Sequence, residues 1–106
     1  MGTGEFIKRL ACVIDANGNV VRGFMVKGCE LVGQNEYVIT WDVPLHGGEA
    51  KTNFAATIGS ATTEPVEPGF VTVSLDAAPD KLRVRTYATN GSPARRSFHI
   101  AAFRDR

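Results

Sequence analysis

The 106-residue sequence lacks several features that mark particular classes of protein. No run approaches the roughly 18 apolar residues of a membrane-spanning helix, and 12 basic against 11 acidic residues leave a net charge of only +1. The sequence therefore predicts no membrane insertion and no nucleic-acid binding, because it has no strongly basic field. A chain of this length also has little room for a deep active site beside a cofactor.

Residues suited to catalysis or metal binding are scarce as well. No G-x-S-x-G turn is present to expose a nucleophile. His46 and Glu49 are close enough in sequence to share a metal, but two glycines lie between them and no third ligand is near. Cys12 and Cys29 form no C-x-x-C or Cys/His cluster, and they are either a disulfide between neighbouring strands or two buried thiols. We therefore expect a protein that is not an enzyme, with no cofactor and no metal.

What the sequence does contain is a series of short alternating runs of β-branched and aromatic residues, separated by turn residues. In the stretch NEYVITWDV, residues 35–43, the side chains of Tyr37, Ile39 and Trp41 fall on one side of an extended chain. We expect strands at 7–15, 20–24, 25–31, 37–43, 53–58, 70–75, 82–89 and 97–103. Eight such strands fit an all-β fold of two antiparallel sheets, a sandwich or jelly roll, better than one open sheet.

Two local segments test this interpretation. Asn17-Gly18 is the strongest hairpin signal, because both central residues of a type I′ turn need positive φ. The segment FAATIGSATT, residues 54–63, is the one stretch with a helical alternative. Its β-branched residues argue against a helix, since branching at Cβ restricts χ1 there.

The alternation also predicts which side chains form the core. The expected inward positions are Leu10, Cys12, Ile14, Tyr37, Ile39, Trp41, Phe54, Ala56, Ile58, Val71, Val73, Leu75, Leu82, Val84, Thr86, Phe98 and Ile100. Residues 1–6, MGTGEF, resemble a vector-derived tag, because Gly-Thr and Glu-Phe are what two common restriction sites encode. Residues 7–106 are expected to form a single sandwich domain.

One predicted strand carries a row of cations. Lys81, Arg83 and Arg85 alternate with apolar residues and are followed on the same face by Tyr87. Like charges on one face repel each other unless something offsets them. The row is either a solvated face with acidic cross-strand partners or a ligand-binding strip, in which arginine binds an anion and tyrosine stacks on a sugar.

The last predicted strand places His99 on one face with Ser97, Ala101 and Phe103. In a monomer this histidine would be exposed or half-buried. In an oligomer it would lie at a subunit contact or near a central axis.

Five segments together carry a resemblance: ACVIDANGNVV, NEYVITWDV, FAATIG, PGFVTVSL and LRVRTYATNGSPARRSFHIAAF. Over nearly all of residues 9–103 the chain resembles the small all-β domains at the C-termini of bacterial and phage fibre-like or collagen-like proteins. It departs from their G-x-Y-x-V-x-aromatic pattern, because Asn35 and Glu36 precede Tyr37 where glycine is usual.

The resemblance implies a compact sandwich, often trimeric, that caps an extracellular fibre and touches a glycan or a cell-surface receptor. No catalytic residues carry over. We therefore expect a non-catalytic binding and assembly module at the tip of a fibre-like or secreted protein, with a purely structural trimerisation domain as the alternative. In the expected homotrimer, three copies meet through the final strand with His99 and Phe103 near the axis.

Overall fold

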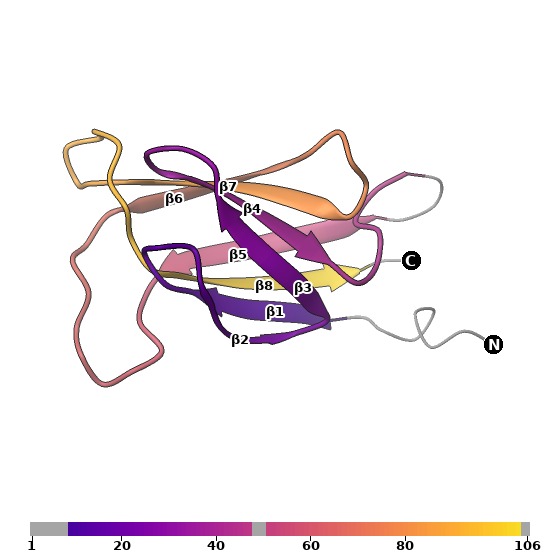
Figure 1. The fold of residues 1–106 in the computed structure, drawn as a ribbon, viewed down its shortest axis with the longest axis horizontal. Coiled ribbons are helices and arrows are strands. Elements are labelled where there is room, and N and C mark those ends of the chain that lie inside the picture. Colours follow the sequence, from indigo (N-terminus) through magenta and orange to yellow (C-terminus); the bar gives the residue numbers. More distant parts are fainter. Residues whose placement is uncertain (1–8, 48–50, 105–106) are drawn as a thin grey trace.

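The computed structural model describes residues 9–47 and 51–104, which form two packed antiparallel sheets (Figure 1). Sheet A has the strand order β2-β1-β8-β5 and is built from β1 (Arg9–Ile14), β2 (Val20–Phe24), β5 (Thr52–Ile58) and β8 (Phe98–Arg104). Sheet B has the order β3-β4-β7-β6 and is built from β3 (Val26–Leu31), β4 (Glu36–Trp41), β6 (Phe70–Leu75) and β7 (Lys81–Tyr87). The all-β sandwich of eight strands is confirmed.

The predicted strands agree closely with the observed ones. β2 and β6 have the predicted bounds, and every other strand end lies within two residues of its prediction. The segment with a helical alternative is β5 followed by an irregular loop, so the strand interpretation is confirmed. No helix that is long and apolar enough to span a membrane occurs in the described ranges. The expected tag, residues 1–6, lies outside the described residues.

The core lies between the sheets and is formed by the inward positions of the central strands. Trp41, Tyr37 and Phe98 are its largest fully buried side chains. The ring of Tyr37 meets Phe98 edge to face at 5.0 Å between centroids, and its hydroxyl donates a hydrogen bond of 2.7 Å to the carbonyl oxygen of Ala16. Such edge-to-face contacts and a satisfied hydroxyl are what a buried tyrosine needs. Tyr37 therefore connects sheet B to the β1–β2 hairpin.

Leu75 is paired with the buried Leu82 and so points to the core side as predicted, but it is not buried, since 48% of it is exposed. It ends β6, an edge strand that pairs only with β7. A residue at the end of an edge strand has few neighbours to cover it. The central strands keep their predicted inward residues buried.

The β1–β2 hairpin is confirmed, but its type I′ turn is wrong. Only Gly18 has positive φ (92°), while Asn17 does not. The Asp15 carboxylate accepts hydrogen bonds from the backbone N–H groups of Asn17 and Asn19, each at 2.9 Å. These bonds stabilise a longer turn that needs a single left-handed residue, as in hairpins that combine a turn with a bulge.

The chain passes from sheet A to sheet B at Met25, between β2 and β3 (Figure 1). Met25 has φ of 66°, which is unusual for a residue with a side chain. Its carbonyl oxygen accepts a hydrogen bond of 2.9 Å from the N–H of Asp42. This left-handed residue ends one strand and redirects the chain into the other sheet.

Cys12 and Cys29 are free thiols in the structure and do not form the disulfide that was the other alternative. Cys12 is buried and Cys29 is partly buried. Burial raises the pKa of Cys12 to about 12, and the nearby Cys29 adds to this effect. Burial also raises the pKa of Cys29 to about 12. Both groups therefore stay protonated at neutral pH.

The raised pKa values of the two thiols predict that the fold loses stability at high pH. Because folding raises both pKa values from 9.0 to about 12, the thiols stabilise the fold below pH 9, and this contribution is lost as the pH rises towards 12. Urea unfolding at pH 8 and at about pH 10.5 should show a lower midpoint at the higher pH. The double variant Cys12→Ala/Cys29→Ala should show a smaller decrease. If the urea midpoint fell equally in the two proteins, the loss of stability would not come from the two thiols.

Candidate binding surface

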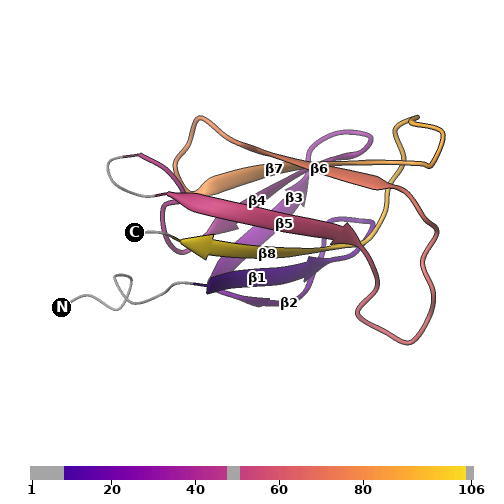
Figure 2. The same cartoon turned by 180° about the vertical axis from the view of Figure 1, so that it is seen from behind.

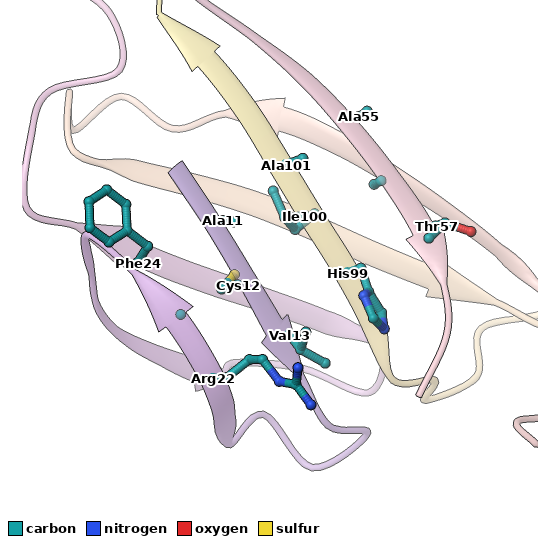
Figure 3. Close-up of a pocket in the computed structure, with 12 residues that line it drawn as sticks. Ala11, Cys12, Val13, Arg22, Phe24, Ala55, Thr57, His99, Ile100 and Ala101 are labelled. Carbon is teal, nitrogen blue, oxygen red and sulfur yellow. The ribbon is translucent and has the colours of Figure 1, made fainter. Parts of the chain in front are cut away.

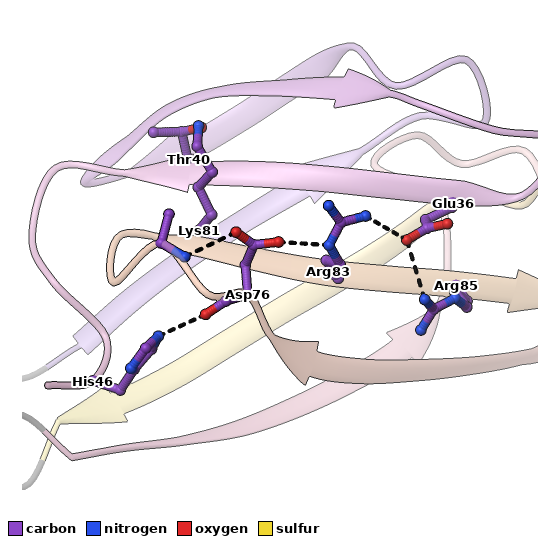
Figure 4. A network of polar contacts seen from close by, with 8 residues as sticks. Glu36, Thr40, His46, Asp76, Lys81, Arg83 and Arg85 are labelled. Atoms are coloured by element: carbon purple, nitrogen blue, oxygen red, sulfur yellow. Dashed lines mark hydrogen bonds and ion pairs between the residues drawn. The ribbon is translucent and has the colours of Figure 1, made fainter.

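The predicted strip of Lys81, Arg83, Arg85 and Tyr87 lies along β7 on the outer face of sheet B. Figure 4 shows its three cations. The Arg83 guanidinium contacts two carboxylates, with Nη1 2.6 Å from Glu36 Oε2 and Nε 2.5 Å from Asp76 Oδ1. Arg85 Nη2 lies 3.2 Å from the same Glu36 oxygen. The acidic cross-strand partners of the first interpretation are therefore present.

These contacts set the protonation of the strip. Hydrogen bonds to Glu36 and Asp76 raise the pKa of Arg83 above its ordinary value. The N–H of Ala78 and the Arg83 guanidinium lower the pKa of Asp76. Since two carboxylates already neutralise two arginines, the strip offers less free positive charge than its sequence indicates. Ligand binding by the strip stays a prediction.

His46, the first candidate metal ligand, lies beside this network. Its Nε2 is 2.7 Å from the carbonyl oxygen of Asp76, and a carbonyl can only accept, so this nitrogen carries the proton. Glu49, its suggested partner, lies outside the described residues. Within the part of the chain that the structure describes, no three His, Cys, Asp or Glu residues are grouped as a metal site.

The outer face of sheet A differs from that of sheet B because its centre is apolar. The register aligns Ala11 of β1 with Ala101 of β8, and Ala101 with Ala55 of β5. Residues paired in this way point to the same side of the sheet. On β2, Phe24 is paired with Ala11 and is 55% exposed. Figure 2 shows this sheet with β5, β8, β1 and β2 in succession.

These residues line a groove of about 580 Å³, which we call the sheet A groove (Figure 3). Small alanines form its floor, while Phe24 stands at one end of it. The side chains of Arg22, Val13 and His99 follow at the other end. A mostly apolar groove of this size, with a few polar groups, is typical of small-molecule binding sites.

The polar end of the groove is held by the loop that follows β5. The carbonyl oxygen of Ser60 lies 3.0 Å from His99 Nε2, and that of Ala61 accepts a 3.0 Å hydrogen bond from Arg22 Nη2. Gly59 leaves room for the His99 ring, since a Cβ at this position would lie 3.0 Å from it and the ring would have to shift slightly. Two consecutive carbonyl groups thus position side chains from β8 and β2.

The predicted interface residues both lie on this face. His99 lines the groove. Phe103 lies four residues further along β8, where it is 50% exposed and pairs with Arg9 and Asn53. The structure therefore brings His99 and Phe103 to one exposed surface. Their role in an oligomer stays a prediction.

The groove has no arrangement that activates a nucleophile among its described residues. His99 uses Nε2 for a backbone carbonyl, not for a hydroxyl or a thiol. Cys12 also lines the groove, but burial raises the pKa of its thiol to about 12, which disfavours the reactive thiolate. A base within hydrogen-bond reach of its nucleophile is what covalent catalysis requires.

Comparison with known proteins does not identify a function for this surface. No protein-family model, curated protein or solved structure matches the chain. The resemblance to tip domains of fibre-like proteins therefore stays a prediction. The groove was missed at the level of sequence, although outward alanines in three predicted strands were a visible sign that this face is not polar.

Proposed function

We propose that the chain is a non-catalytic binding domain that holds its partner in the sheet A groove. The observation that carries this proposal is an exposed apolar groove of about 580 Å³ on the outer face of sheet A, floored by small alanines with the half-exposed Phe24 at one end. Exposed apolar surface costs free energy in water, so a contiguous hollow of this kind indicates a binding site. The resemblance to tip domains supports a setting at the end of an extracellular fibre-like or secreted protein.

The groove is a better candidate than the strip on sheet B. Arg83 and Arg85 are occupied by Glu36 and Asp76, and an anionic ligand would have to compete with these carboxylates. The groove has no such internal competitor over its alanine floor. The sequence led us to expect a glycan or receptor at the strip. The next experiment distinguishes binding at the strip from binding in the groove.

The test is a fragment screen by ¹H–¹⁵N NMR on the folded domain. We expect the fragments that bind to shift the amides of Ala11, Ala55 and Ala101. Ala101→Leu fills the groove and should abolish these shifts, whereas Thr72→Leu adds the same side chain to the outer face of sheet B and should preserve them. Shifts centred on Arg85 and Tyr87 would reject the groove in favour of the strip.

Self-assembly through the same face is a second candidate, favoured by the half-exposed Phe103 beside the groove. Multi-angle light scattering on the purified chain decides it. A mass of three chains that falls to one chain in Phe103→Glu would support the homotrimer. A monomer at tens of micromolar would remove it.

A further inference from the structure

We infer that the sheet A groove binds a small amphiphile, with an apolar body along the alanine floor and a carboxylate at the Arg22 end. This inference rests on the proposed function and names its ligand class. It follows from the distribution of apolar and charged groups along the groove.

One end of the groove can hold the apolar body of the ligand. Ala11, Ala55 and Ala101 leave space above the sheet because each extends only a methyl group, and Phe24 borders that space. These surfaces have no polar side-chain atoms, so water in this part of the groove finds few partners there. An alkyl chain or ring that displaces this water gains the free energy of apolar burial.

The other end of the groove carries Arg22, which can bind the carboxylate of the ligand. Arg22 is exposed and donates one hydrogen bond, to the carbonyl oxygen of Ala61. Its guanidinium has five N–H donors, and no ion pair within the described ranges involves it. Arg83 and Arg85, by contrast, each contact a carboxylate of the chain itself. Among the described residues, no carboxylate therefore neutralises the charge of Arg22, which lies at the edge of an apolar groove.

The surroundings of Arg22 strengthen this charge complementarity. No Asp or Glu occurs among the described residues that line the groove. Figure 3 shows the guanidinium of Arg22 and the ring of His99 at the same end, away from Phe24. The bond to Ala61 holds the arginine side chain towards the groove before a ligand arrives, which reduces the entropy lost on binding.

A second copy of the chain fits this face less well. In a two-fold contact the same patch meets itself, so Arg22 of one copy would face a groove lining that contains Arg22 and no Asp or Glu to pair with. Burying an unpaired charge in this way is costly. The charge distribution therefore favours an acidic ligand over a two-fold dimer through this face.

The experiment titrates the protein with octanoate, octan-1-ol and octylamine, and follows binding by ¹H–¹⁵N NMR. We expect octanoate to bind as one molecule per chain, with shifts at Ala11, Ala101 and His99, and more tightly than the alcohol or the amine. Arg22→Gln should weaken octanoate binding about tenfold and leave octan-1-ol unchanged, because only the charged hydrogen bonds are lost. Arg85→Gln removes a positive charge from the opposite sheet and should change neither.

The other outcomes separate this inference from the proposed function. Equal binding of octanoate and octan-1-ol, unaffected by Arg22→Gln, would overturn the carboxylate and leave the groove as a binding site. Loss of octanoate binding in Arg85→Gln but not in Arg22→Gln would move the site to sheet B. Oligomers that exclude all three probes from the groove would assign the face to a second copy and overturn the inference.

Discussion

Replacing Trp41 with alanine should lower the free energy of unfolding by about 3–5 kcal/mol, the usual cost of truncating a buried aromatic residue. Trp41 is fully buried at the end of β4, with Val43 and Leu45 buried in the same core. Its Nε1 has no hydrogen-bond partner among the described residues, so the loss is one of packing. Small domains are stable by only about 5–15 kcal/mol, and the variant should be partly unfolded or close to it.

Urea unfolding followed by circular dichroism measures this loss, since the variant has no tryptophan fluorescence. The matched control is Phe24→Ala, which removes an aromatic ring that is 55% exposed in the sheet A groove. We expect the control to change the unfolding free energy by less than about 1 kcal/mol. Similar losses in the two variants would mean that the outer face of sheet A is covered in solution or that Trp41 is not a core residue.

The core could be predicted from the sequence because it depends on one local rule. Tyr37, Ile39 and Trp41 alternate with more polar residues, and the period of two places them together on one side of a strand. The same rule placed Leu82, Val84 and Thr86 inward on β7. The rule gives the side but not the burial at the end of an edge strand, as at Leu75, which shares the side of Leu82 and is still 48% exposed.

The sheet A groove could not be predicted, because it depends on strand order. Ala11, Ala55 and Ala101 are distant in sequence and meet only because β8 lies between β1 and β5. No local pattern specifies that strand order, which follows from how the two sheets pack as a whole. Acidic cross-strand partners for Arg83 were one of the two interpretations, but which residues they are could not be predicted, since Glu36 is positioned by the pairing of β4 with β7.

The second large effect on stability is expected at Gly69, a glycine that lies close to the backbone of the neighbouring strand. Gly69→Ala should destabilise the fold by about 1–3 kcal/mol, as overpacking does. A Cβ at Gly69 would lie 2.1 Å from the carbonyl oxygen of Tyr87, a backbone atom that no side-chain rotation can move away. The start of β6 must then separate from β7, where Phe70 pairs with Tyr87. Urea unfolding measures the loss.

Gly28→Ala is the matched control, because a Cβ on this β3 residue would meet no atom within 4 Å. Its φ is not in the left-handed region, so alanine fits the native backbone and restricts the unfolded chain, which should stabilise the protein by up to about 1 kcal/mol. The two substitutions are chemically identical and should have opposite signs. If Gly69→Ala proved as mild as Gly28→Ala, the close contact between the start of β6 and Tyr87 would be wrong, and with it the packing of that edge of sheet B.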